Sequence, residues 1–267
     1  MLNDLIIVVI LTILIHMIDT FSYSVRLAGV TTNKLAVALS LFNILVLVSR
    51  TSNMVQGPLA GSFIDYARIS GNVGWVEVQF RYIIFSATIG SILGAMLIPT
   101  FIRVFSRAIM HLDVSGSIPL LLRRTLTISK IGMIKHHIRA PRFYFLHTLR
   151  IAGVPKRLII LQILITAIYT VGVLAAMYAS LIVPEHATKA LMSSGIINGI
   201  ATLLLSVFVD PQVALLTDQV ISGRKKYQTI SSMVGVLVIG KILGTLLGQV
   251  LFIPSAQVIA LFANFIS

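Results

Sequence analysis

Long apolar stretches separated by short polar segments recur along the whole chain of 267 residues. An α-helix rises about 1.5 Å per residue, so roughly 20 apolar residues cross a hydrocarbon core about 30 Å thick. Six stretches of about this length are present, at residues 5–23, 35–55, 82–105, 158–183, 190–209 and 230–253. The pattern predicts an all-α, polytopic integral membrane helical bundle. Residues 1–267 then form a single transmembrane domain.

Composition supports this interpretation. Hydrophobic residues make up 57% of the chain and charged residues only 11%, whereas a soluble domain carries about 25% charged residues. The chain therefore has too few charges to cover a surface that faces water. It also contains no cysteine, which excludes disulfides, thiolate metal sites and thiol catalysis.

The basic residues predict the orientation of the bundle. Most of the 21 Lys and Arg residues fall in segments 24–34, 103–157 and 210–229, and positive loops stay in the cytoplasm. Both termini are then expected outside. The net charge of +13 could indicate nucleic-acid binding, but basic loops beside apolar spans favour contact with anionic lipid headgroups.

The segments between the spans carry their own patterns. The central basic loop, 106–157, contains Ser117-Ile-Pro, a typical helix start, followed by apolar residues at helical spacing. This predicts an amphipathic helix at the membrane interface, with a solvated cytoplasmic loop as the alternative. The outside segment Ser49–Gln79, with its apolar patches and Trp75, is expected to form a re-entrant or interfacial hairpin. The tail after Pro254 is too short to span and should lie at the interface or pack on the bundle.

Two kinds of repetition bear on how the helices pack. Arg26-Leu-Ala-Gly-Val resembles Arg150-Ile-Ala-Gly-Val, so an internal repeat, as three related hairpins or two offset halves, is one interpretation; transporter sites commonly lie between repeats. Glycines at intervals of four residues predict faces where helices approach closely. They are Gly90 and Gly94, Gly195 and Gly199, and Gly240, Gly244 and Gly248.

Several polar side chains lie inside the apolar spans. An ionisable group at the centre of a membrane helix costs roughly 2.5–3.5 kcal/mol, so it should face a cavity or a partner. His16 and Asp19 are three residues apart and share one helix face. Lys241 lies about a dozen residues from Ile253, too far inside the span to be explained by snorkelling, and is expected to be a buried cation facing a cavity.

The other polar candidates have two interpretations each. Asn43 lies within the second span, and Arg50 and Asn53 lie near its outer end. Asp19 and Arg50 could serve function or form a structural polar link, and Arg26 and Lys34 could be no more than positive-inside anchors.

Motifs of energy-coupling and hydrolytic enzymes are missing from the sequence. It has no phosphate-binding loop, no Gly-x-Ser-x-Gly, no His-Glu-x-x-His and no cluster of aspartates for magnesium. No metal or cofactor is therefore expected, and nothing supports an enzyme. Arginine donates two hydrogen bonds to phosphate and keeps its charge. The residues alone indicate a transporter or receptor for an anionic or amphipathic ligand.

Longer stretches resemble a known family. They are Ile15-His-Met-Ile-Asp-Thr-Phe-Ser-Tyr-Ser-Val-Arg-Leu-Ala-Gly-Val, then Lys34-Leu-Ala-Val-Ala-Leu-Ser-Leu-Phe-Asn-Ile-Leu-Val-Leu-Val-Ser-Arg-Thr-Ser-Asn-Met, Leu149-Arg-Ile-Ala-Gly-Val-Pro and Asp210-Pro-Gln-Val-Ala-Leu-Leu-Thr-Asp-Gln-Val. This pattern strongly resembles the Amj family of bacterial lipid II flippases, which act as an alternate to MurJ. The resemblance covers most of the chain.

The resemblance implies a function in peptidoglycan biosynthesis, cell wall biogenesis and cell shape. A flippase of this family moves lipid II, the undecaprenyl-pyrophosphate-linked disaccharide-pentapeptide, from the inner to the outer leaflet of the bacterial cytoplasmic membrane, without a cofactor. Anionic lipids and cell-wall synthesis proteins are the further partners expected. The alternatives are a membrane enzyme acting on isoprenoid phosphates and a small-solute transporter.

The same resemblance, together with the position of Lys241 in the last span, gives the candidate site residues. The residues expected to bind the substrate headgroup are Asp19, Arg26, Lys34, Asn43, Arg50, Asn53 and Lys241. The residues expected to take part in charge or proton coupling are His16, Asp19, Asp210 and Asp218.

Overall fold

The computed structural model describes residues 2–115 and 154–266, and within them the side chains of Arg50, Asn53, Val114 and Ser115 fall outside the description. The described residues contain no strand, and six helical segments are long and apolar enough to cross a membrane. This confirms a polytopic, all-helical membrane protein. The elements are α1 (Leu2–Thr32), α2 (Leu35–Ser70), α3 (Val73–Ser115), α7 (Lys156–Ile182), α8 (Ala187–Leu204), a π-helical turn (Leu205–Val209), α9 (Asp210–Ile221) and α10 (Tyr227–Phe265).

Several helices continue past the apolar stretches that predicted them. Helix α2 runs to Ser70 and α3 begins at Val73, so segment 49–79 consists of the end of α2 and the start of α3 and is not a separate re-entrant or interfacial hairpin. Gly71 makes the tight connection, with a φ of 71° and its N–H bonded to the Ala67 carbonyl at 2.8 Å. A glycine at this position ends a helix without steric cost. The interfacial helix predicted from Ser117 lies outside the described residues.

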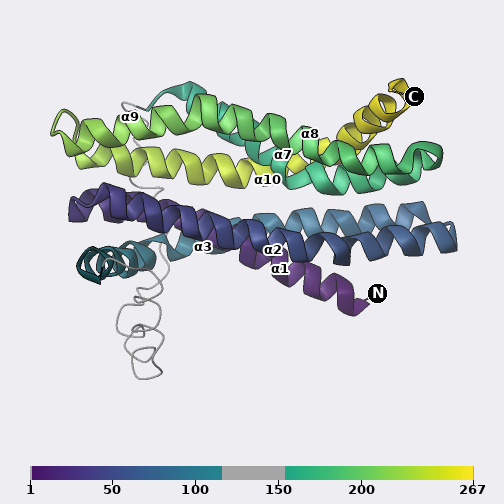
Figure 1. Cartoon of the computed structure of the whole chain (residues 1–267), viewed down its shortest axis with the longest axis horizontal. Coiled ribbons are helices and arrows are strands. Elements are labelled where there is room, and N and C mark those ends of the chain that lie inside the picture. The colour runs from purple at the N-terminus through teal and green to yellow at the C-terminus, as the bar shows by residue number, and fades with distance from the viewer. Residues whose placement is uncertain (1, 116–153, 267) are drawn as a thin grey trace.

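The chain after residue 209 also differs from the expectation. Segment 210–229 was expected to be a loop, but Asp210–Ile221 forms α9, which follows α8 through the π-helical turn. Pro254 does not end the last helix either, because α10 continues to Phe265. Proline removes one backbone hydrogen bond and bends a helix. Figure 1 shows α10 turning aside over its last part.

The helices form two halves, α1–α3 and α7–α10, which lie one above the other in Figure 1. In each half the first helix packs against both others: α1 against α2 and α3, and α7 against α8 and α10. Each half crosses the bundle three times. The second half therefore runs in the opposite direction to the first, as Figure 1 shows, and both termini lie at the same end.

Glycines pack the third helix of each half onto the first in the same way. A Cβ at Gly94 would lie 2.6 Å from the Met17 carbonyl oxygen, and a Cβ at Gly244 would lie 2.7 Å from the Ile163 carbonyl oxygen. Gly90 and Gly240 make equally close contacts one turn away. These close approaches confirm the packing faces predicted on the third and last spans. The prediction for Gly195 and Gly199 was wrong, because nothing lies within 4 Å of a Cβ at either position.

The sequence around these glycines is also repeated. Ile89-Gly-Ser-Ile-Leu-Gly in α3 matches Ile239-Gly-Lys-Ile-Leu-Gly in α10, and Thr20-Phe-Ser-Tyr in α1 matches Thr166-Ala-Ile-Tyr in α7. The two halves thus share their helix packing and these motifs and run in opposite directions, which is the pattern of an inverted repeat. This repeat differs from the one suggested by the pair of Arg-x-Ala-Gly-Val segments, since Arg26 lies within α1 and Arg150 lies outside the described residues.

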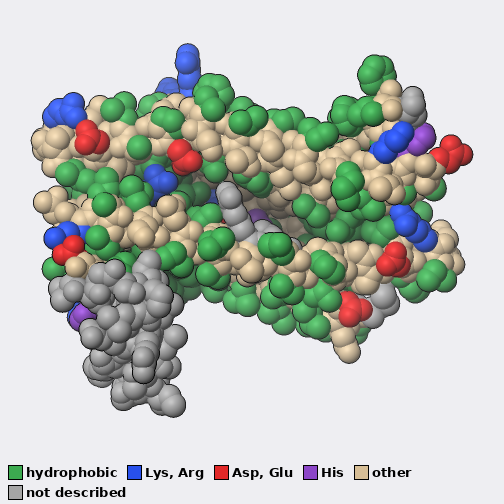
Figure 2. Space-filling model, in the orientation of Figure 1, with side chains coloured by type: hydrophobic (Ala, Val, Ile, Leu, Met, Phe, Trp, Pro, Cys, Tyr) green, Lys and Arg blue, Asp and Glu red, His purple; other side chains and the backbone are tan. Residues whose placement is uncertain are grey.

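The repeat places Lys241 of α10 at the position that Ser91 has in α3. The two helices run antiparallel and touch through Thr88 and Thr245, whose hydroxyls bond at 3.1 Å. Thr88 precedes Ser91 by three residues and Thr245 follows Lys241 by four, so Ser91 and Lys241 lie at nearly the same level. The outside of the bundle carries many large apolar side chains, visible in Figure 2, as a lipid-facing surface requires.

Candidate functional site

A cavity of about 580 Å³ lies between the two halves. Every helix contributes to its wall, as does the π-helical turn. Figure 2 shows a hollow in the middle of one long face, where the N-terminal half meets the C-terminal half. Helices α2 and α8 both line the cavity but do not pack along each other. The cavity is therefore open sideways, toward the region that lipid would fill.

Helix α1 presents one polar face to this cavity. His16, Asp19, Tyr23 and Arg26 all line it, and their spacing of three, four and three residues places them on a single side of a helix. Most of the other residues of α1 are apolar, and the helix packs against α2 and α3. Because the apolar residues of α1 pack against α2 and α3, the polar face of the helix points into the cavity.

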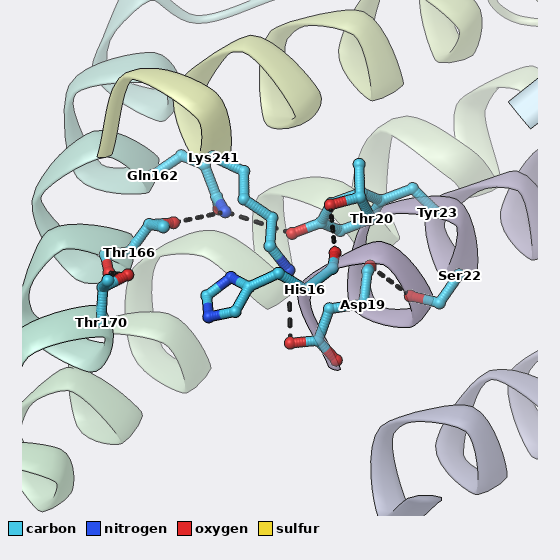
Figure 3. A network of polar contacts seen from close by, with 9 residues as sticks. All are labelled: His16, Asp19, Thr20, Ser22, Tyr23, Gln162, Thr166, Thr170 and Lys241. Atoms are coloured by element: carbon cyan, nitrogen blue, oxygen red, sulfur yellow. Dashed lines mark hydrogen bonds and ion pairs between the residues drawn. The ribbon is translucent and has the colours of Figure 1, made fainter. Parts of the chain in front are cut away.

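Asp19 pairs with Lys241 across the two halves. Lys241 Nζ lies 3.3 Å from Asp19 Oδ2, and the lysine side chain is only 7% exposed, against 32% for the aspartate. The ring of Tyr23 lies 6.0 Å from the same ammonium group. Figure 3 shows Lys241 reaching from α10 toward α1. Lys241 therefore faces a cavity, as its position in the last span predicted, and Asp19 is its partner.

A second ion pair in the cavity wall joins α1 to α9. Arg26 Nη2 is 3.6 Å from Asp210 Oδ1 of α9, and the guanidinium lies 4.8 Å from the centre of the Phe42 ring. Arg26 is 10% exposed and Asp210 49% exposed. In the described part of the chain each of these two cations has a carboxylate beside it. A charge held inside a bilayer needs such a partner.

The wall formed by α7 and α8 is polar but neutral. Gln162 donates from Nε2 to the Tyr23 hydroxyl at 3.1 Å and to Thr166 at 3.2 Å. Tyr169 and Thr202 share a hydrogen bond of 2.6 Å between their hydroxyls. Sequence reasoning missed Tyr23, Gln162 and Tyr169 because it searched for charges. The signal that would have found them is the repeated Thr-x-x-Tyr pattern on the first helix of each half.

Some buried polar atoms of the cavity wall have no hydrogen-bond partner among the described residues. They are His16 Nδ1, Arg26 Nε, Gln162 Oε1 and Asn198 Oδ1. A buried polar atom without a partner is unfavourable, and native proteins rarely keep one without a reason such as an absent ligand or water. These atoms mark where a bound molecule would find hydrogen bonds.

The structure brings only part of the predicted residue set together. His16, Asp19, Arg26, Asn43, Asp210 and Lys241 line the cavity. Lys34 lies away from it and pairs with Asp113 at 2.8 Å, and Asp218 pairs with Arg224 at 2.8 Å on the exposed surface. The side chains of Arg50 and Asn53 fall outside the described part, so the predictions for them stay predictions. No group of three His, Cys, Asp or Glu residues in the described ranges could hold a metal ion.

A family model described as "Alternate to MurJ" matches residues 11–263 of this chain. The chain belongs to the Amj family. The curated protein "Lipid II flippase Amj" of Bacillus subtilis (strain 168) is 44% identical to it over 249 residues, which cover 93% of this chain and 92% of that protein. No solved structure matches the chain. The Amj match includes all the helices that line the cavity, and the chain is a multi-pass membrane protein.

Proposed function

We propose that this protein is a lipid II flippase, which carries the undecaprenyl-pyrophosphate-linked disaccharide-pentapeptide from the inner to the outer leaflet of the bacterial cytoplasmic membrane. The relative that is 44% identical over most of the chain bears that name. The single observation that supports it best is the polar cavity between two inverted halves, with a buried Lys241 and a buried Arg26 in its wall. The relative is named as a flippase and not as an enzyme, which favours transport over chemistry on isoprenoid phosphates.

The two ion pairs suggest how the cavity receives a pyrophosphate. Arg26 follows Asp19 by seven residues, so the two pairs lie about 10 Å apart along α1. In the structure the carboxylates of Asp19 and Asp210 lie beside Lys241 and Arg26 and neutralise them. A pyrophosphate offers the same cations more oxygen acceptors and more charge, and it replaces the carboxylates. Both cations already lie in the cavity wall. The headgroup can therefore bind them there, and no charged side chain has to move into lipid.

The sideways opening accounts for the prenyl chain. The apolar tail stays among lipid chains while the headgroup enters the cavity between α2 and α8. Exposed apolar side chains also cover the side of α8 that faces away from the cavity, where Ile196 is 52% and Ile200 is 50% exposed. The polar headgroup is thus separated from hydrocarbon by the protein, and the tail remains in the environment that it prefers.

The basic residues set the proposed direction. Arg224, Lys225 and Lys226 lie at the end of the bundle that carries the C-terminus of α1, and both chain termini lie at the other end. The positive end belongs in the cytoplasm, where it contacts anionic lipids, and both termini lie outside. Movement of an anion outward is then favoured by about 2.3 kcal/mol per charge per 100 mV of membrane potential. Cell-wall synthesis proteins are the partners that would use the delivered lipid.

The test of this function is leaflet-resolved labelling of lipid II in cells depleted of every other flippase. Expression of this protein should restore lipid II to the outer leaflet, and its Lys241→Met variant should not, at equal membrane abundance. Lipid II that stays in the inner leaflet despite normal amounts of the wild-type protein would refute the function. Phosphate released from the lipid would instead support the enzyme alternative.

A further inference from the structure

The two repeat-related helices that line the cavity have different chemistry on the same face. The match of Thr20 with Thr166 aligns His16, Asp19, Tyr23 and Arg26 of α1 with Gln162, Ile165, Tyr169 and Gly172 of α7. The tyrosines agree, but every ionisable group of the α1 face other than tyrosine is replaced by a neutral residue on α7. On α10 the same comparison sets Lys241 against Ser91. All the charges thus lie on the α1, α9 and α10 side of the cavity wall in the described part of the chain.

We propose that the neutral wall of α7 and α8 is a separate subsite, which binds the sugar part of the headgroup. The hydroxyl and amide N–H groups of the sugar donate hydrogen bonds to oxygen atoms of this wall. This inference rests on the proposed flippase function and assigns the other wall to the pyrophosphate. Sugars carry many donors and no charge. A wall of amide oxygens and hydroxyls recognises them, whereas a second set of cations would compete for the phosphates.

Gln162 supplies the first acceptor of this subsite. Its side chain is 4% exposed, and both donated hydrogen bonds come from its Nε2, to Tyr23 and Thr166. These bonds fix the amide, so Oε1 remains buried at the cavity wall without a partner among the described residues. Gly240 makes room for it, since a Cβ there would lie 2.8 Å from Gln162 Cγ.

Asn198 supplies the second acceptor. Its Oδ1 is also buried and lacks a partner within residues 2–115 and 154–266. The amide lies over Gly172, where a Cβ would come within 2.7 Å of Oδ1. Gly172 follows Gln162 by ten residues, so the two amides are about 15 Å apart along α7. Tyr169, Thr170 and Thr202 line the cavity over the same stretch of α7 and α8, which gives the subsite the length of a short oligosaccharide.

The test compares two lipids that differ in the sugar and peptide. Purified protein in lipid nanodiscs is titrated with lipid II and with undecaprenyl pyrophosphate. The variant Asn198→Leu keeps the size of the side chain and removes its amide. We expect it to weaken lipid II binding about tenfold, the effect of one hydrogen bond to a buried group, and to change binding of undecaprenyl pyrophosphate less than twofold. Gln162→Met should do the same, whereas Lys241→Met should weaken both lipids.

A structural role for the amide predicts a different result. Loss of a buried acceptor that lacks a partner should leave the melting temperature of the ligand-free protein unchanged or higher, whereas loss of a packing contact would lower it. Gly172→Ala is a second variant, which keeps the amide and displaces it, and it should also weaken lipid II binding selectively. If Asn198→Leu does not fold, the result for Gly172→Ala decides.

Other outcomes overturn the subsite. Equal losses for both lipids, no loss for either, or a wild-type protein that binds lipid II no tighter than undecaprenyl pyrophosphate would each refute it and leave the flippase function standing. A wild-type protein that binds neither lipid would refute the flippase function together with the subsite.

Discussion

Asp19 of α1 and Lys241 of α10 join the two inverted halves through an ion pair of 3.3 Å at the cavity wall. The repeat sets Lys241 against Ser91 and Asp19 against Ile165, so neither member of the pair has a counterpart with charge. An inverted repeat gives both halves the same helix packing. In each of these two pairs of equivalent positions only one residue is charged, and the two charged residues form a cation and its counter-ion where the halves meet.

Removal of the lysine charge should affect stability and transport separately. Lys241→Met leaves the Asp19 carboxylate at the cavity wall without its counter-ion, and we expect a loss of stability of roughly 1–3 kcal/mol, below the 3–5 kcal/mol of a fully buried pair because Asp19 is partly exposed. The double variant Asp19→Asn with Lys241→Met should regain most of the melting temperature but not the transport. Recovery of transport in the double variant would show that the pair only holds the helices together.

The Arg26–Asp210 pair makes a second prediction. If Asp210 occupies the place of a phosphate, Asp210→Asn should leave binding of undecaprenyl pyrophosphate unchanged or tighter. Arg26→Gln should weaken it at least tenfold, because a hydrogen bond to a charged group contributes about 1.5–3 kcal/mol. Asp210 is half exposed, but its substitution leaves the buried Arg26 without its carboxylate, so we expect a loss of stability of roughly 1–3 kcal/mol. Titration of both variants in nanodiscs measures this, and equal weakening by the two would contradict the exchange of partners.

The glycine contacts predict which helix faces cannot accept a methyl group. Gly244→Ala places a Cβ 2.7 Å from the Ile163 carbonyl oxygen, and we expect it to lower stability by about 1–3 kcal/mol through overpacking. Gly195→Ala is the matched control, since nothing lies within 4 Å of its Cβ. It should be neutral or slightly stabilising, because alanine favours the helix. Melting temperatures in detergent compare the two, and an equal fall for both would contradict the close packing.

The absence of cysteine from the sequence allows a clean test of the opening between α2 and α8. Val46 on α2 and Leu205, the first residue of the π-helical turn after α8, both line the cavity. In the double variant Val46→Cys with Leu205→Cys, a reducible bifunctional thiol reagent should stop transport, and a reductant should restore it. The single variants treated in the same way should keep transporting. Full transport by the cross-linked protein would mean that the headgroup takes another route.

Hydrophobic periodicity predicted the fold class and the six crossings, because lipid imposes apolar stretches of a fixed length. It did not predict where the helices end. Residues 57–70 and 210–221 are amphipathic or polar enough to resemble loops, yet they form helix because neighbouring helices and short connections such as Gly71 support them. Hydropathy identifies the residues that cross the hydrocarbon core, but it does not detect a helix that continues beyond the core.

The candidate site was predictable in part. His16, Asp19 and Lys241 were identified because a charge inside a span is costly. Their partners were not, since the contact between Asp19 and Lys241 joins positions far apart in the chain. Lys34 and Arg26 also look alike in the sequence, as basic residues near the end of a span, but Lys34 pairs with Asp113 away from the cavity. The neutral residue Gln162 costs little in a helix, so no energetic signal distinguished it; the repeat and its buried unpaired oxygen do. Asn198 is visible in the sequence as a polar residue within the fifth span, but only its buried unpaired oxygen connects it with the subsite.

The most direct test of the account is the rate at which purified protein moves lipid II between the leaflets of proteoliposomes. The wild-type protein and the control Arg224→Ala, an exposed surface residue, should expose inner-leaflet lipid II at the same rate. Lys241→Met should slow that rate at least tenfold while remaining folded in the membrane. A Lys241→Met protein that flips lipid II at the wild-type rate would contradict the claim that the cation in the cavity wall accompanies the headgroup across the bilayer.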